Sequence, residues 1–162
     1  MKKLLVLCLL LYIAGSLSAL ENLYAGFGAE LNANSRKSVA VGGNLSFGMG
    51  INELFDAGFK AGYSYGMDTL STLEFQGLFR YKNLPFNITG LFVQAELGAV
   101  IFFYEGDTYP SFLGGLAAGW RIFPGSGNWY IEPQVRAGYP FLWGVGITVG
   151  IPIATNKGKG EE

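Results

Sequence analysis

The sequence predicts an all-β fold: an eight-stranded antiparallel up-and-down transmembrane β-barrel with a cleaved N-terminal signal peptide. Three observations lead to this prediction. Apolar residues alternate with small or polar residues along most of the chain. The 162 residues are 50% hydrophobic, include 25 glycines and are only 14% charged, against about 25% charged in an average soluble domain. After the first twenty residues, no apolar run approaches the ~20 residues that a transmembrane helix needs.

The N-terminal segment has the order of parts that defines a secretory signal peptide. Lys2 and Lys3 precede an apolar run from Leu4 to Ala14, and small residues follow up to Ala19. Cleavage after Ser18 and cleavage after Ala19 both fit this pattern. The predicted division of the chain is a signal peptide at 1–19, a β-barrel domain at 20–154 and a polar C-terminal tail at 155–162.

Export changes the composition of the mature chain. Removal of residues 1–19 takes away Lys2, Lys3 and the single cysteine, Cys8, and leaves nine basic residues against twelve acidic ones. A net charge of −3 offers no basic surface for nucleic acid. Without cysteine, neither a disulfide nor a Cys-based metal site can form.

The strands are predicted from period-two alternation, which places successive side chains on opposite faces. Range 37–51 shows it most clearly: Val39, Val41, Leu45, Phe47 and Ile51 share one face, and small or polar residues occupy the other. The same pattern predicts eight strands in all, at 23–31, 37–51, 55–66, 72–81, 90–103, 112–122, 129–139 and 143–151.

Residues typical of turns separate these strands. Because the connections are short, each strand is expected to pair with its sequence neighbour in an antiparallel meander. An even strand number puts both ends of the barrel domain on one side, so the connections near 32–37, 67–70, 104–111 and 140–142 share the other side. The longest of these, 104–111, is the best candidate contact site. Pro133 interrupts a strand, where it removes a ladder hydrogen bond, so a bulge or a register slip is expected there.

Alternation alone fits two kinds of barrel. A soluble lipocalin-like barrel turns its apolar face inward, whereas a membrane barrel turns that face to lipid. The polar face here consists mostly of small or uncharged residues, with about one charge per strand, which favours the membrane barrel. Aromatic residues also gather near both ends of the strands, as bilayer interfaces select: Tyr63, Tyr65, Phe103, Phe112, Tyr139 and Trp143 towards one end, and Phe55, Phe79, Tyr81, Trp120 and Trp129 towards the other.

A signal peptide, eight alternating strands, two aromatic rims and short turns together resemble the small eight-stranded outer-membrane barrels of the OmpA transmembrane-domain, OmpX and OmpW type. The stretch Tyr130–Phe141 also looks like the penultimate strand of small barrels from spirochaete-type bacteria. The chain departs from the usual pattern at its last strand, which ends on Ile151, Pro152 and Ile153 without a terminal aromatic residue. The resemblance implies a bacterial outer-membrane location, a lipid bilayer environment and insertion by the outer-membrane assembly machinery.

The inward face carries a nearly balanced set of charges. Because buried charges must be paired and an eight-stranded barrel is just wide enough for its own side chains, these charges predict a salt-bridged plug. Loss of Arg80 or Arg136 should then destabilise the barrel. The predicted lumenal network consists of Glu30, Asp56, Glu74, Glu96 and Glu132 with Lys60, Arg80, Arg121 and Arg136.

The chain contains no histidine, which is the commonest general base and metal ligand. No catalytic, cofactor-binding or metal-binding residues are predicted, and the protein is not expected to be an enzyme. The sequence favours a structural role in the cell envelope. A narrow channel for small or hydrophobic solutes is the alternative.

Overall fold

The computed structural model describes residues 22–34, 39–67, 70–82, 84, 89–125 and 127–154. The predicted signal peptide and the predicted polar tail lie outside these residues. Among the described residues, no helix is long and apolar enough to cross a membrane. The strands are β1 (Leu23–Asn34), β2 (Val39–Gly50), β3 (Phe55–Gly66), β4 (Ser71–Tyr81), β5 (Leu91–Tyr104), β6 (Asp107–Trp120), β7 (Tyr130–Tyr139) and β8 (Phe141–Ala154).

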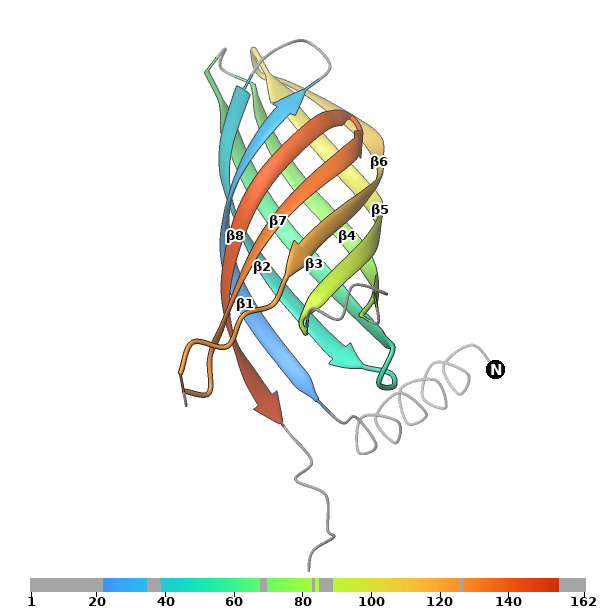
Figure 1. The fold of residues 1–162 in the computed structure, drawn as a ribbon. Helices are drawn as coiled ribbons and strands as arrows, with labels where there is room; N and C mark the ends of the chain where they lie inside the picture. The colour runs from blue at the N-terminus through green and yellow to red at the C-terminus, as the bar shows by residue number, and fades with distance from the viewer. Residues whose placement is uncertain are drawn as a thin grey trace, which may run out of the picture.

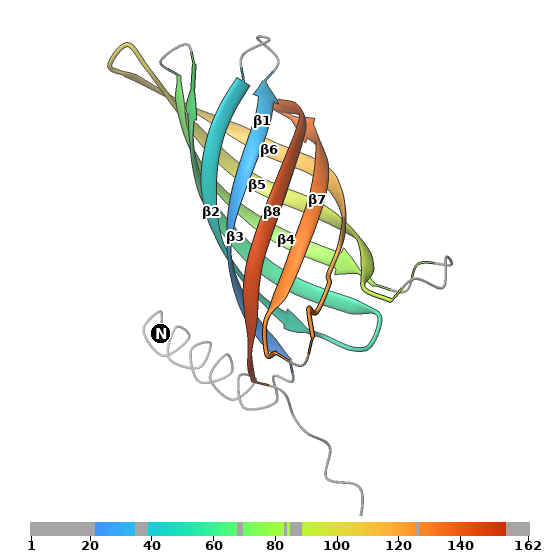
Figure 2. The same cartoon turned by 60° about the vertical axis from the view of Figure 1, so that its left-hand side comes forward.

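The eight strands form one closed antiparallel barrel, as predicted. Every strand pairs with its sequence neighbour, and β8 closes the barrel by pairing with β1 over Leu23–Asn34. The strands run up and down at a marked tilt around a single axis (Figure 1). We call the end where β1 begins and β8 finishes the terminal end, and the opposite end the far end; a second view shows both (Figure 2).

The apolar face of every strand points out of the barrel. Phe27 on β1, Leu97 on β5 and Leu116 on β6 are 65%, 61% and 69% exposed. The alternate positions are buried and polar, for example Glu30, Asn44, Lys60 and Glu74. Since an apolar exterior of this extent is stable only against lipid, the arrangement is that of a membrane barrel and excludes the lipocalin-like alternative.

The prediction of an open connection over 104–111 is wrong, because β5 extends to Tyr104 and β6 begins at Asp107. Tyr104 pairs directly with Asp107, and the two residues between them, Glu105 and Gly106, both have positive φ angles, 52° and 90°. Two positive φ angles define the type I′ turn, whose twist suits a tight hairpin. Pro110 is tolerated in β6 because pairing with β7 begins only at Gly114, so its side towards β7 is an unpaired edge.

Pro133 interrupts one ladder without the expected bulge or register slip. Its pairing with Ile147 on β8 continues unbroken. On the β6 side, the ladder stops at Gly119 and Gln134 and resumes as a single bridge between Ile122 and Ile131 in the same register. Because Ile122 and Ile131 exchange two hydrogen bonds of 2.9 Å, the next hydrogen-bonded pair would be Trp120 and Pro133. Pro133 has no N–H to give, so the seam between β6 and β7 lacks a bond there.

We expect the substitution Pro133→Val to strengthen this seam. The restored amide can donate to the Trp120 carbonyl and so join the Ile122–Ile131 bridge to the main ladder. The amide protons of Ile122 and Ile131 should then exchange more slowly with deuterium, because local opening of the seam is suppressed. Pro110→Val is the matched control and should leave both exchange rates unchanged. Equal exchange rates in the Pro133→Val variant and the unaltered protein would show that the proline does not weaken the seam.

The interior is layered along the barrel axis. Near the far end, Val100, Leu113 and Phe141 form an apolar cluster whose members are at most 2% exposed, with Phe102 packed against it. Polar and charged side chains fill the lumen from this cluster towards the terminal end. The apolar cluster therefore lies between the charged part of the lumen and the far end.

Candidate functional site: the charged lumen and its mouth

Five side chains from five strands meet at mid-lumen in what we call the central charge cluster: Glu30, Lys60, Glu74, Glu96 and Arg136. Arg136 extends from β7 and contacts acids on three other strands. It lies 3.2 Å from Glu30, 3.1 Å from Glu74 and 3.1 Å from Glu96. Lys60 on β3 pairs with Glu30 at 2.8 Å and with Glu96 at 3.6 Å. The five side chains are at most 8% exposed, so the cluster is a buried layer that links five of the eight strands across the lumen.

Neutral amides complete the hydrogen bonding of the central acids. Asn44 Nδ2 donates to Glu30 Oε1 at 2.8 Å, and Gln94 Nε2 donates to Glu96 Oε1 at 3.0 Å. Gln94 also accepts from the Arg80 guanidinium at 3.0 and 3.1 Å. Its amide therefore connects the central cluster to a second group of charges nearer the terminal end.

This second group, the mouth charge cluster, consists of Asp56, Arg80, Lys82, Arg121 and Glu132. Glu132 forms an ion pair with Arg80, with 2.7 Å between Oε1 and Nη1, and a second ion pair with Arg121. Aromatic rings cover the two guanidinium groups: Arg80 lies 3.7 Å from the Phe92 ring centre, and Arg121 lies 4.1 Å from Tyr24 and 4.3 Å from Tyr130. Such cation–π contacts strengthen as water is excluded.

All nine charged residues predicted for the lumen lie in these two clusters, and each has at least one ion pair. Sequence reasoning missed Lys82, because it lies just after the strand predicted at 72–81 and is also the first residue after β4. Its ammonium group reaches back to Asp56 at 2.6 Å. The predicted network contains five acids and only four bases, and this excess of one acid could have indicated that a further cation takes part.

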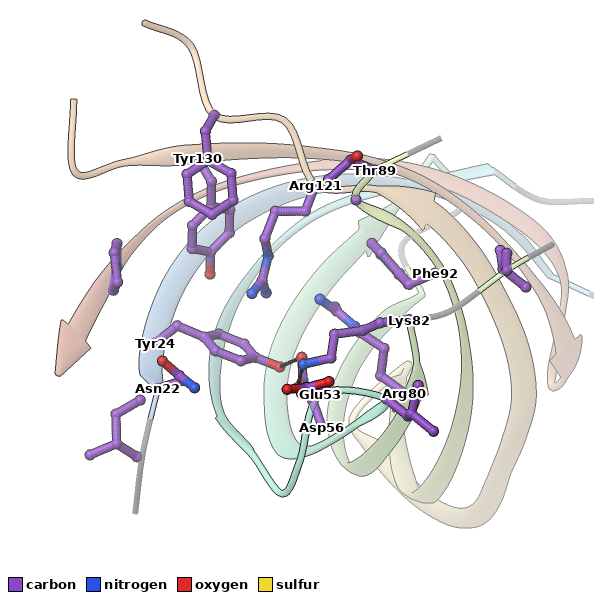
Figure 3. Close-up of a pocket in the computed structure, with 16 residues that line it drawn as sticks. Asn22, Tyr24, Glu53, Asp56, Arg80, Lys82, Thr89, Phe92, Arg121 and Tyr130 are labelled. Atoms are coloured by element: carbon purple, nitrogen blue, oxygen red, sulfur yellow. Dashed lines mark hydrogen bonds and ion pairs between the residues drawn. The ribbon is translucent and has the colours of Figure 1, made fainter. Parts of the chain in front are cut away.

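A pocket of about 800 Å³ opens at the terminal end above the mouth charge cluster. Figure 3 shows Arg121 pointing into it from one side, near Tyr130, and Asp56 and Glu53 on the opposite side. Lys82 lies between them in this view, and Phe92 lies to the right of Arg121. The pocket ends at Arg80, behind which the central charge cluster occupies the lumen.

The chemistry of the lumen is that of a plug. Each lumenal carboxylate named above is held by at least one cation. Among the described residues, no group of three or more histidine, cysteine, aspartate or glutamate side chains is arranged to hold a metal ion.

A closed eight-stranded barrel with an apolar exterior and a polar interior defines the class: an integral barrel of the outer-membrane type. Solved structures share this fold. They include Neisserial surface protein A, with 12% identity, a TM-score of 0.59, and coverage of 82% of this chain and 96% of that one. The N-terminal barrel domain of Pseudomonas aeruginosa OprF has 11% identity, a TM-score of 0.53, and coverage of 82% and 97%.

The outer-membrane enzyme PagL also shares the fold, with 16% identity, a TM-score of 0.54, and coverage of 79% of this chain and 99% of that one. No protein-family model matches the sequence, and no curated protein matches it. At these identities the likeness establishes the fold, which confirms the predicted resemblance to small outer-membrane barrels. The resemblance to spirochaete barrels stays a prediction.

Proposed function

We propose that this protein is a non-conducting structural barrel of the bacterial outer membrane. The observation that supports this role most directly is the reach of Arg136 from β7 to acids on β1, β4 and β5. One side chain thereby ties opposite walls of the barrel together across its axis. The apolar cluster of Val100, Leu113 and Phe141 adds a second closure nearer the far end.

The proposal includes that the protein is not an enzyme. The fold by itself does not decide this point, since the enzyme PagL shares it. The support comes from the residues: the chain has no histidine, and the lumenal carboxylates are engaged in ion pairs. The proposal also includes insertion by the outer-membrane assembly machinery, although the chain after β8 lacks the usual terminal aromatic residue.

The alternative role is a narrow channel. It is favoured by the pocket at the terminal end, which already opens about 800 Å³ of the lumen down to Arg80. Conduction through the rest would require the ion pairs of Arg136 to separate.

Planar-bilayer conductance of the refolded mature protein tests the proposal. The unaltered barrel should give no discrete current steps, because both the central charge cluster and the far-end apolar cluster block the lumen. Heat-modifiable gel migration and membrane fractionation of the same protein establish that a folded barrel is being measured. Regular steps from the unaltered protein would overturn the structural role and establish the channel.

A further inference from the structure

A second cavity lies in the wall of the barrel, at the weakened seam between β6 and β7. It measures about 670 Å³ and is lined by parts of four strands, β5 to β8. Its lining includes outward-facing residues such as Val93, Ala118 and Val135, and also inward-facing Phe92 and Gln134. Residues from both faces line it where the ladder between β6 and β7 is interrupted, between the Gly119–Gln134 pair and the Ile122–Ile131 bridge. We call this cavity the seam crevice.

The seam crevice is almost wholly apolar. Apart from Gln134 and the indole of Trp120, its lining side chains are hydrocarbon or absent at glycine. The Trp120 Nε1 atom already donates to the Thr89 carbonyl at 2.9 Å, which leaves its ring to line the cavity. A volume of this size lies within the usual range for small-molecule sites, about 300–1,000 Å³. The crevice therefore suits a hydrocarbon chain.

The seam crevice adjoins the pocket at the terminal end. Leu84 and Phe92 line both cavities. The pocket at the terminal end has the charges that the crevice lacks. Its mouth charge cluster contains three cations and two acids. Glu53 also lines this pocket, so its charges balance overall, and an apolar site and a charged site share one wall.

Two groups in the mouth are positioned for a further anion. The Nη2 atom of Arg121 is buried without a hydrogen-bond partner among the described residues. The Lys82 side chain is 33% exposed although it pairs with Asp56. An added carboxylate could accept charge-assisted hydrogen bonds from these cations. Glu53 lies on the opposite side of the mouth, beside Asp56 (Figure 3), so its charge does not occupy the Arg121 side.

We propose that the protein binds a free long-chain fatty acid at this site. The hydrocarbon chain occupies the seam crevice, passes Leu84 and Phe92, and places its carboxylate near Arg121 and Lys82. A single-chain carboxylate matches both cavities at once, whereas an ordinary lipid tail would fill only the crevice. No covalent step is involved.

Tryptophan fluorescence with a dibrominated stearate as quencher tests the proposal. The protein is refolded in phosphatidylcholine vesicles in two forms with one tryptophan each. One form retains Trp120 in the crevice, through Trp129→Phe and Trp143→Phe. The other retains Trp143, which is lipid-exposed near the far end, through Trp120→Phe and Trp129→Phe. Trp143 thereby reports quencher that is simply dissolved in the bilayer.

We expect the quenching of Trp120 to saturate. Half-maximal quenching of Trp120 should need about one-tenth of the quencher fraction that Trp143 needs, which corresponds to a preference of ~1.4 kcal/mol for the crevice over the bilayer. Ala118→Phe should abolish this preference, because residue 118 lies between Val93 and Val135 in the crevice lining. Ala29→Phe is the matched control, since Ala29 is also exposed on the outer face, on β1, and it should leave the preference intact.

The predicted position of the carboxylate is tested by comparing the free acid with its methyl ester. Arg121→Gln should weaken binding of the acid and leave binding of its methyl ester unchanged. Equal quenching of Trp120 and Trp143 at every quencher fraction would overturn the proposal. Equal quenching of Trp120 by dibrominated phosphatidylcholine and by the free acid would also overturn it, because an ordinary lipid tail would then be the occupant. Since Ala118→Phe alters only the lipid-facing surface, the test does not depend on whether the Arg121 variant folds.

Discussion

Replacement of Arg136 by alanine should lower the free energy of unfolding by about 3–5 kcal/mol, the cost of leaving buried charge without its partner. Arg136 contacts Glu30, Glu74 and Glu96. In its absence Lys60 remains the only ion-pair partner of these three acids among the described residues, and Glu74 has none. Urea titration of the barrel in vesicles, followed by tryptophan fluorescence, measures the loss.

Two variants separate lost charge pairing from lost packing. Val135→Ala truncates the neighbouring residue of the same strand, which faces lipid and is 56% exposed. It should cost far less than Arg136→Ala. Addition of Glu74→Gln and Glu96→Gln to Arg136→Ala should recover part of the stability, because it removes the two negative charges that exceed the single positive charge of Lys60. An Arg136→Ala barrel as stable as the Val135→Ala barrel would contradict the plug described here.

The second large effect is expected at Gly98, where β5 approaches β4 very closely. A Cβ atom at this position would lie 1.9 Å from the Phe75 carbonyl oxygen and 2.6 Å from the Gln76 Cα atom. Both contacts are to backbone, which cannot move aside without separating the strands. Gly98→Ala should therefore cost about 1–3 kcal/mol or more, as overpacking does, in the same urea titration.

Gly77 on β4 provides the matched control. A Cβ atom there would meet only the Leu97 carbonyl oxygen, at 3.7 Å, an ordinary van der Waals contact. Gly77→Ala should be neutral, or stabilising by up to about 1 kcal/mol, because alanine restricts the unfolded chain. If both alanine variants unfold at the same urea concentration, the close approach of β4 and β5 at Gly98 does not constrain this barrel.

The strands and their outer faces could be predicted because they depend on local order in the chain. Val39, Val41, Leu45 and Phe47 share a face in any extended strand, whatever lies beside it. Range 55–66 agrees with β3 at both ends. The prediction was wrong at 104–111, where the residues are typical of a loop. Glu105, Gly106 and Pro110 suggested an open connection, but the first two form a tight turn and the third lies on an unpaired edge.

The nine charges were predicted to be lumenal, but their partners could not be predicted. Arg136 and Glu74 are 62 residues apart in the chain and meet only after β7 and β4 have taken their places in the closed barrel. Lys82 follows the end of β4, where alternation gives no information on direction, yet it bonds to Asp56.

The sequence by itself determined that this protein is a barrel of strands with one apolar and one polar face, because alternation is a property of each strand alone. The small and sparsely charged residues of the polar face indicated that this face points inward. Only the tertiary structure decided how the charges divide into a central cluster and a mouth cluster. It also showed that Pro133 causes no shift of register and that a crevice lies at the seam between β6 and β7. Both features arise between strands, and the distances between strands are fixed only when the barrel closes.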